Sequence, residues 1–135
     1  MSKQPEMVTV LYYRTARNHD TKMNLDNQMY QLLNYAQQHG ISNFILYADC
    51  GFSGLNFERP AFTSMWGHIR DRLVKQVVVT SVDRISRNTC DSLRFIDDAA
   101  KHGAAVFSIQ EGGGPLAESE VFSVIRSFLK GGEQE

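Results

Sequence analysis

Residues 76–88 read QVVVTSVDRISRN, a run of β-branched residues that leads into a polar loop with two arginines. The run at 76–82 predicts a buried strand, because valine and threonine favour the extended backbone. Similar apolar runs lie at 8–13 (VTVLYY), 44–47 (FILY) and 104–109. We therefore expect four strands in this chain.

Helical patterns separate the four strands. Apolar residues recur every three or four positions, with residues typical of helix ends on either side. The expected helices are residues 25–36, between Asn24 as N-cap and Gly40 as stop, residues 60–73, entered at Pro60 and ending with Leu73, and a stretch from about Asp91 to Gly103. Strands that alternate with helices in this way pair in parallel through right-handed crossovers.

A single domain accounts for the length of 135 residues. We expect an α/β domain over residues 1–130, with a parallel sheet covered by helices on both faces, and a short tail at 131–135. The pattern leaves the order of the strands in the sheet open.

The last apolar pattern, at residues 121–129, is broader than the stripe that packs against one sheet. The surplus predicts a contact with a second subunit, a homodimer or a higher oligomer, although residues missing from this sequence could cover it instead. The apolar members are Val121, Phe122, Val124, Ile125, Phe128 and Leu129.

The composition excludes several classes of protein. Fourteen Lys and Arg against fifteen Asp and Glu give a net charge of −1, so bulk charge does not hold this chain on nucleic acid. Cys50 and Cys90 are too few for a disulfide scaffold, and no Cys or His spacing fits a zinc site. No secretion signal is visible, and no apolar run approaches the ~18 residues of a membrane span. We expect a cytoplasmic protein without a membrane or metal partner.

The loops that follow the first three strands hold five of the nine arginines. Because the carboxyl ends of parallel strands share one edge of the sheet, these side chains are expected on the rim where ligands bind. They are Arg14, Arg17, Arg59, Arg84 and Arg87. Guanidinium groups gathered on one edge of a near-neutral protein indicate a phosphate or phosphodiester ligand. The alternative is that Arg84 and Arg87 pair with Asp83 and other carboxylates to hold their loop.

Five motifs in these loops and in the first helix support a more specific interpretation. They are residues 12–16 (YYRTA), 25–28 (LDNQ), 47–54 (YADCGFSG), 58–60 (ERP) and 83–88 (DRISRN). In this order, over about residues 8–130, the chain resembles the catalytic domain of the serine recombinases, the resolvase/invertase and large serine integrase family. The D-x-G-x-S-G loop followed by E-R-P is most similar to the large-integrase and conjugative-transposon branch.

The resemblance implies site-specific DNA recombination without a metal or nucleotide cofactor. In the family a serine hydroxyl attacks a DNA phosphodiester, which forms a phosphoseryl link and frees a 3′-hydroxyl, and arginines stabilise the developing charge. By this resemblance the phosphate would be held by Arg14, Arg84 and Arg87, with Asp83 orienting an arginine or handling a proton, and with Gln28, Ser53 and Arg59 completing the pocket. The alternatives are a solvated helix residue for Gln28, a turn residue for Ser53 and a loop cap for Asp49.

One position departs from the family pattern. The nucleophilic serine of Y-x-R-x-S stands two residues after the first arginine, and this chain has Ala16 there. Alanine has no oxygen, so the covalent step lacks its attacking atom. Strand alternation turns Thr15 to the opposite side from Arg14 and Ala16, and Ser53 has no adjacent base. The resemblance therefore predicts a recombinase domain that does not cleave DNA.

Two explanations for Ala16 stay open. Either an active-site serine was replaced on purpose, or the protein is a natural relic that keeps the fold and the phosphate pocket. A relic would act without catalysis, by pairing with an intact recombinase or by weak binding to the DNA backbone. In the family the last helix continues as a long arm toward DNA, whereas Gly131 and Gly132 disfavour a helix here by about 2 kcal/mol.

Overall fold

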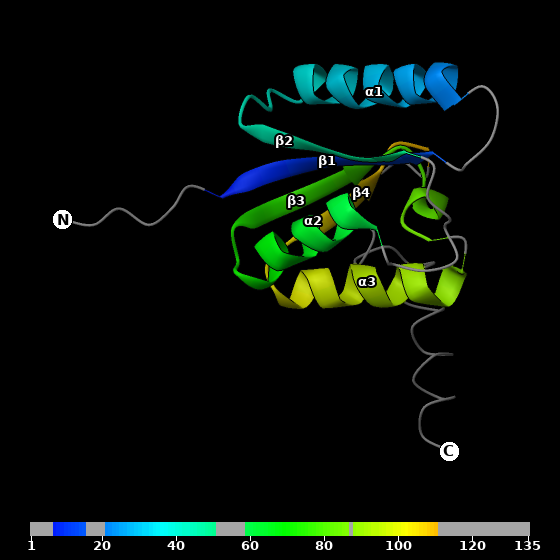
Figure 1. Ribbon diagram of the computed structural model, residues 1–135. Coiled ribbons are helices and arrows are strands. Elements are labelled where there is room, and N and C mark those ends of the chain that lie inside the picture. The colour runs from blue at the N-terminus through cyan, green and yellow to red at the C-terminus, as the bar shows by residue number, and fades with distance from the viewer. Residues whose placement is uncertain (1–6, 16–20, 51–58, 87, 111–135) are drawn as a thin grey trace.

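The computed structural model describes residues 7–15, 21–50, 59–86 and 88–110 (Figure 1). Strands and α-helices alternate along these residues, and a short 3-10 helix follows the third strand. In chain order the elements are β1 (Val8–Thr15), α1 (Thr21–Gln38), β2 (Phe44–Cys50), α2 (Pro60–Arg70), β3 (Val74–Val79), η1 (Val82–Arg84), α3 (Thr89–Lys101) and β4 (Ala105–Ser108).

The four strands form one parallel sheet in the order β2-β1-β3-β4. Helix α1 covers one face, and α2 and α3 cover the other (Figure 1). The predicted α/β fold, a parallel sheet with helices on both faces, is confirmed. The chain leaves β1 toward β2 on one side and leaves β3 toward β4 on the other, so the connections diverge at the carboxyl ends of β1 and β3. A sheet of this kind binds its ligands at that point.

The central strand β1 is buried on both faces. Val10 and Tyr12 pack with α2 and α3, whereas Leu11 and Tyr13 pack with α1. Successive side chains of a strand point to opposite faces, so this division follows from the alternation of the sequence. The same alternation continues to Arg14, which lies on the side of Tyr12.

The first helix begins earlier than its apolar pattern predicts. Helix α1 starts at Thr21, so Asn24 lies inside the helix and the expected N-cap at Asn24 is wrong. Its end is confirmed, because α1 stops at Gln38 and Gly40 has a φ of 66°. A left-handed residue of this kind closes a helix, and the Ile41 N–H then bonds to the Ala36 carbonyl at 2.8 Å.

The second helix and the third strand are shifted from the predicted ranges. Helix α2 ends at Arg70 rather than Leu73, because Arg72 has a φ of 60° and turns the chain away from the helix axis. Strand β3 therefore begins at Val74, two residues before the predicted start, and ends at Val79. The predicted end at Val82 is wrong, since Val82 opens the helical turn η1.

The third helix agrees with its prediction to within two residues. Helix α3 begins at Thr89, and the Asn88 side chain caps it by accepting the Asp91 N–H at 3.2 Å. The expected stop at Gly103 is confirmed by a φ of 83°. Strand β4 follows within the predicted range of 104–109. The helix predicted at 121–129 lies outside the described residues.

Among the helices that the structure describes, none is both long and apolar enough to cross a membrane.

Replacing Arg72 by glycine should stabilise the protein. Arg72 is exposed and left-handed, and that conformation costs a residue with a Cβ atom about 1 kcal/mol relative to glycine. We expect Arg72→Gly to raise the free energy of unfolding in urea by about that amount. Arg70→Gly is the matched control, because it places glycine in the last turn of α2 and should lower stability. An Arg72→Gly protein no more stable than the wild type would contradict this account.

Candidate functional site

The carboxyl edge of the sheet brings four segments together. Arg14 lies near the end of β1, and Asp49 of β2 lies directly opposite it in register. The turn η1 follows β3, and Arg59 immediately precedes the first residue of α2. Of the five arginines that the sequence assigns to the rim, these segments carry Arg14, Arg59 and Arg84, whereas Arg17 and Arg87 lie outside the described residues. The structure brings Arg14, Arg59 and Arg84 into contact through shared partners, and we call these three residues the arginine cluster.

Arg14 is held by the main chain of η1. Its Nη2 donates to the Asp83 carbonyl at 2.9 Å, and its Nε donates to the Arg84 carbonyl at 3.3 Å. Arg84 returns the contact, because its Nη1 donates to the Arg14 carbonyl at 3.2 Å. Arg14 is only 2% exposed, whereas Arg84 is partly exposed. The cluster therefore reaches the surface through Arg84.

Gln28 of α1 supports the same strand end. Its Nε2 donates to the Arg14 carbonyl at 3.0 Å, and its side chain is buried. The alternative of a solvated helix residue is therefore wrong for Gln28. The Gln28 amide therefore holds the main chain of Arg14, whereas the Arg14 guanidinium is held by the main chain of η1.

Arg59 is the most deeply buried cation of the cluster, with 1% exposure. Its Nη1 donates to the Tyr12 hydroxyl at 3.0 Å and to the Arg84 carbonyl at 3.3 Å, and its Nη2 donates to the Ile85 carbonyl. The guanidinium carbon lies 4.6 Å from the centre of the Phe62 ring. Burial lowers the pKa of Arg59, and Tyr12 and Asp49 oppose that shift. Arg59 and Arg14 thus share the Arg84 carbonyl as an acceptor.

Asp49 is the buried carboxylate of this network. It accepts three hydrogen bonds, from the Tyr12 hydroxyl at 2.8 Å and from the Ala61 and Phe62 N–H groups at 2.9 Å each. The two N–H groups belong to the first turn of α2, where a negative charge is favourable. Asp49 therefore caps α2 from the neighbouring strand.

Tyr12 joins this carboxylate to the cluster. Its hydroxyl donates to Asp49 and accepts from Arg59. Burial raises the pKa of the Tyr12 phenol far above its ordinary value, Arg59 opposes the rise, and Asp49 adds to it. The sequence places Tyr12 in a motif but assigns it no role. The alternation of side chains along the strand could have predicted that Tyr12 belongs to the site, because it places Tyr12 on the same side as Arg14.

Asp83 contacts Arg14 through its main chain rather than its carboxylate. The carboxylate accepts a hydrogen bond from Ser81, and the side chain is exposed. The alternative was that Arg84 pairs with the Asp83 carboxylate and so holds its loop. This pairing is not observed. Arg84 instead donates to the Arg14 carbonyl.

Three of the predicted site residues lie outside the described residues. They are the nucleophile position Ala16, Ser53 and Arg87. The side chain of Thr15 is likewise not described, so its predicted direction stays a prediction.

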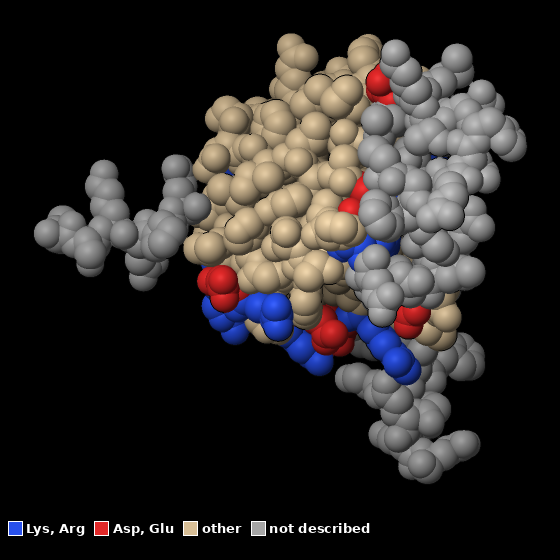
Figure 2. Space-filling view, in the orientation of Figure 1, with Lys and Arg blue, Asp and Glu red and all other residues tan. Residues whose placement is uncertain are grey.

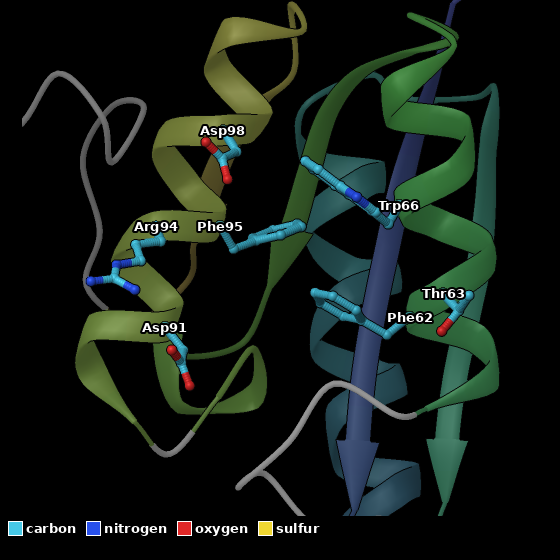
Figure 3. Close-up of a pocket in the computed structure, with 7 residues that line it drawn as sticks. All are labelled: Phe62, Thr63, Trp66, Asp91, Arg94, Phe95 and Asp98. Carbon is cyan, nitrogen blue, oxygen red and sulfur yellow. The ribbon is translucent and has the colours of Figure 1, made fainter.

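The described residues also form a groove between α2 and α3, with a volume of about 340 Å³. Figure 3 shows aromatic side chains of both helices in this groove with polar residues around them. Its lining residues are Phe62, Thr63, Trp66, Asp91, Arg94, Phe95 and Asp98. None of the predicted site residues that the structure describes lines it, but Phe62 lies between the groove and Arg59 of the arginine cluster. In this groove Trp66 packs against Phe95, with 5.7 Å between ring centres.

Charge is distributed without a broad cationic field on the face in Figure 2. The α1 side of that view carries few charges, and Lys and Arg are interspersed with Asp and Glu along the side of α2 and α3. Within the described residues, no group of three His, Cys, Asp or Glu side chains could hold a metal ion. On this face an anion would be recognised by a local group of cations rather than by a charged surface.

Comparison with protein families gives a match over most of the chain. The family model described as "Resolvase, N terminal domain" matches residues 9–130. A protein of Bacillus subtilis (strain 168), whose given name is that of a DNA recombinase, is 28% identical over 90 residues. Those residues are 67% of this chain but only 18% of that protein, so the chain spans less than a fifth of this relative.

Two solved structures extend the likeness to the fold. The N-terminal catalytic domain of TP901-1 integrase has a TM-score of 0.74 and 27% identity, and 93% of each chain is covered. A serine recombinase from Sulfolobus solfataricus has a TM-score of 0.65 and 25% identity, covering 91% of this chain and 83% of that one.

Tyr12→Phe should reduce the loss of stability at alkaline pH. Burial raises the pKa of Tyr12 in the folded protein, whereas an unfolded tyrosine has a pKa of about 10. Above about pH 10 the unfolded state releases a proton that the folded state keeps, so the free energy of unfolding falls as pH rises. Urea unfolding at about pH 8 and about pH 11 measures this fall.

The control for that measurement is Tyr30→Phe, because Tyr30 is 71% exposed and lies outside the network. It should lose as much stability between the two pH values as the wild type does. A Tyr12→Phe protein with the same loss as Tyr30→Phe would show that Tyr12 does not control this fall.

Proposed function

Because this chain belongs to the resolvase family, whose N-terminal domain it matches over residues 9–130, we propose that its arginine cluster binds a phosphodiester of DNA. The observation that carries the proposal is the gathering of three guanidinium groups around the turn η1 at the carboxyl edge of the sheet. Arg14, Arg59 and Arg84 contribute three guanidinium groups to a network in which Asp49 is the buried carboxylate. A guanidinium stays charged at any ordinary pH, so a phosphate oxygen beside the partly exposed Arg84 would be attracted by three neighbouring cations.

In the reaction of a serine recombinase, the cluster would act on charge and geometry. Arginine donors would fix the phosphodiester and stabilise the additional negative charge on its oxygens in the transition state. Gln28 would keep the Arg14 main chain in place from the other face of the sheet. Arg84, which is partly exposed at the turn η1, would contact the phosphodiester from the surface, with the exposed Asp83 beside it.

We propose that this chain binds DNA without cleaving it. Cleavage needs an oxygen that attacks phosphorus while the 3′ oxygen leaves and takes up a proton. Ala16 supplies no oxygen at the nucleophile position of the family pattern. The D-x-G-x-S-G loop and E-R-P favour a mobile-element recombinase of the large-integrase or conjugative-transposon type, which would work in the cytoplasm.

A second, non-enzymatic function is favoured by the apolar surplus of residues 121–129. Through this segment the chain would pair with a second copy or with an intact recombinase. Such a role needs the fold and the segment but no nucleophile, and it is consistent with Ala16.

Restoring the nucleophile tests the first proposal. We expect Ala16→Ser, in a protein fused to a sequence-specific DNA-binding domain, to cleave DNA and form a covalent protein–DNA adduct that denaturing gels detect. Arg84→Ala added to this variant should lower the cleavage rate by about 100-fold or more, because the transition state loses a charged donor.

Ala16→Gly is the matched control and should form no adduct, since glycine also lacks an oxygen. If Ala16→Ser binds its DNA but leaves it intact, the missing hydroxyl is not what prevents cleavage, and the proposal for Ala16 is wrong.

The pairing function predicts a change in oligomeric state. Phe128→Asp places a charge in the apolar pattern of 121–129, and burying it in an interface would be unfavourable. We expect sedimentation velocity to show a dimer or larger species for the wild type and a shift toward monomer for Phe128→Asp. Ser127→Asp adds the same charge at a neighbouring polar position and should leave the distribution unchanged. A monomeric wild type would reject the pairing role.

A further inference from the structure

We propose that Tyr12 is a positioning residue for the arginine cluster, whose hydroxyl, held by Asp49, directs Arg59 onto the turn η1. This inference rests on the proposed phosphate-binding function, because it concerns how the phosphate site keeps its shape. Tyr12 itself lies in the core and is fully buried.

The direction of each hydrogen bond in this chain of contacts is set by the groups themselves. A carboxylate only accepts and a guanidinium only donates. The Tyr12 hydroxyl must therefore donate its proton to Asp49 at 2.8 Å and accept from the Arg59 Nη1 at 3.0 Å. A phenol can fill both roles at once. Tyr12 thus connects a buried anion to a buried cation that do not need to touch.

Arg59 transmits this placement to the turn. Arg59 also donates to the carbonyl oxygens of Arg84 and Ile85, which are consecutive in the main chain. The Arg84 carbonyl also accepts from the Arg14 Nε. A displaced Arg59 would release the main chain to which Arg14 is bonded. The position of Tyr12 therefore affects all three guanidinium groups.

Packing alone does not require a tyrosine at position 12. The ring contacts Phe62 edge to face, with 5.6 Å between ring centres, and a phenylalanine would make the same contact. A fully buried hydroxyl is unfavourable unless it is hydrogen-bonded, and this one has two buried partners. Without it, Arg59 would lose an acceptor and Asp49 would lose a donor.

Strand β2 offers a matched control. Tyr47 pairs with Tyr12 in the sheet register, so the two tyrosines lie side by side on neighbouring strands. The Tyr47 hydroxyl also makes a side-chain hydrogen bond, to the His68 Nδ1 at 2.6 Å. That contact does not involve the arginine cluster. Each of the substitutions Tyr12→Phe and Tyr47→Phe removes one hydroxyl together with its side-chain hydrogen bonds. Only Tyr12→Phe removes a hydrogen bond to the arginine cluster.

The experiment measures inorganic phosphate binding to the full chain by NMR, through the arginine Nε–H signals. For the wild type we expect saturable shifts at the signals of the cluster. Tyr12→Phe should weaken phosphate affinity by about twofold to tenfold, the effect of one lost hydrogen bond, and move the Arg59 and Arg14 signals before phosphate is added. Tyr47→Phe should bind phosphate as the wild type does. Thermal unfolding of both variants shows whether their stabilities are comparable.

Each outcome decides a different claim. Absence of saturable shifts in the wild type would reject the phosphate site itself, and with it the role of Tyr12. Wild-type binding with unchanged affinity in Tyr12→Phe would overturn the positioning role alone. Equal weakening in Tyr12→Phe and Tyr47→Phe would also overturn it, because a general loosening of the sheet would then explain both.

A second variant serves if Tyr12→Phe does not fold. Asp49→Asn keeps the size of the side chain but removes its charge, so the hydrogen bond that residue 49 accepts from the Tyr12 hydroxyl becomes weaker. The phenol that accepts from Arg59 is then held less firmly on the side of residue 49. We expect weaker phosphate binding than in the wild type, and wild-type affinity in Asp49→Asn would contradict the proposal.

Discussion

Within the part of the chain that the structure describes, one buried carboxylate, that of Asp49, organises the carboxyl edge of the sheet. It caps the first turn of α2 through two N–H groups and holds the Tyr12 hydroxyl with a third contact. Through Tyr12 it fixes Arg59, and through Arg59 it fixes the main chain of η1. Removing a buried charge from such a network leaves its partners unpaired, which is far more destabilising than losing an exposed ion pair.

The way in which the guanidinium groups are satisfied bears on function. Arg14 and Arg59 donate to carbonyl oxygens of residues 83–85, which carry only partial negative charge. Carbonyls can satisfy donors and set their directions without neutralising them. The cluster therefore combines fixed donor geometry with three guanidinium groups, two features that the proposed phosphate site would use.

Sequence patterns predicted the elements better than their ends. The spacing of apolar residues predicted the four strands and three helices, and Gly40 and Gly103 follow the ends of two of these helices as expected. The prediction that α2 continues to Leu73 is wrong, because Leu73 has helical spacing although the chain has already turned at Arg72. The N-cap prediction at Asn24 is wrong for a different reason, since a residue typical of a cap can also lie within a helix. Local patterns cannot separate these cases, because the main-chain reversal depends on where the next strand must pair.

By itself, the sequence determined the parallel α/β class, the gathering of arginines in the loops after the first three strands, and the absence of an oxygen at Ala16. These depend on residue type and spacing along the chain. Tertiary structure decided that β1 lies between β2 and β3, which sets Asp49 on one side of Arg14 and η1 on the other. The contacts that build the site join residues 37, 47 and 70 positions apart, from Tyr12 to Asp49, from Tyr12 to Arg59 and from Arg14 to Arg84. Strand order creates those contacts, and strand order is a property of pairing in space that no local stretch of sequence encodes.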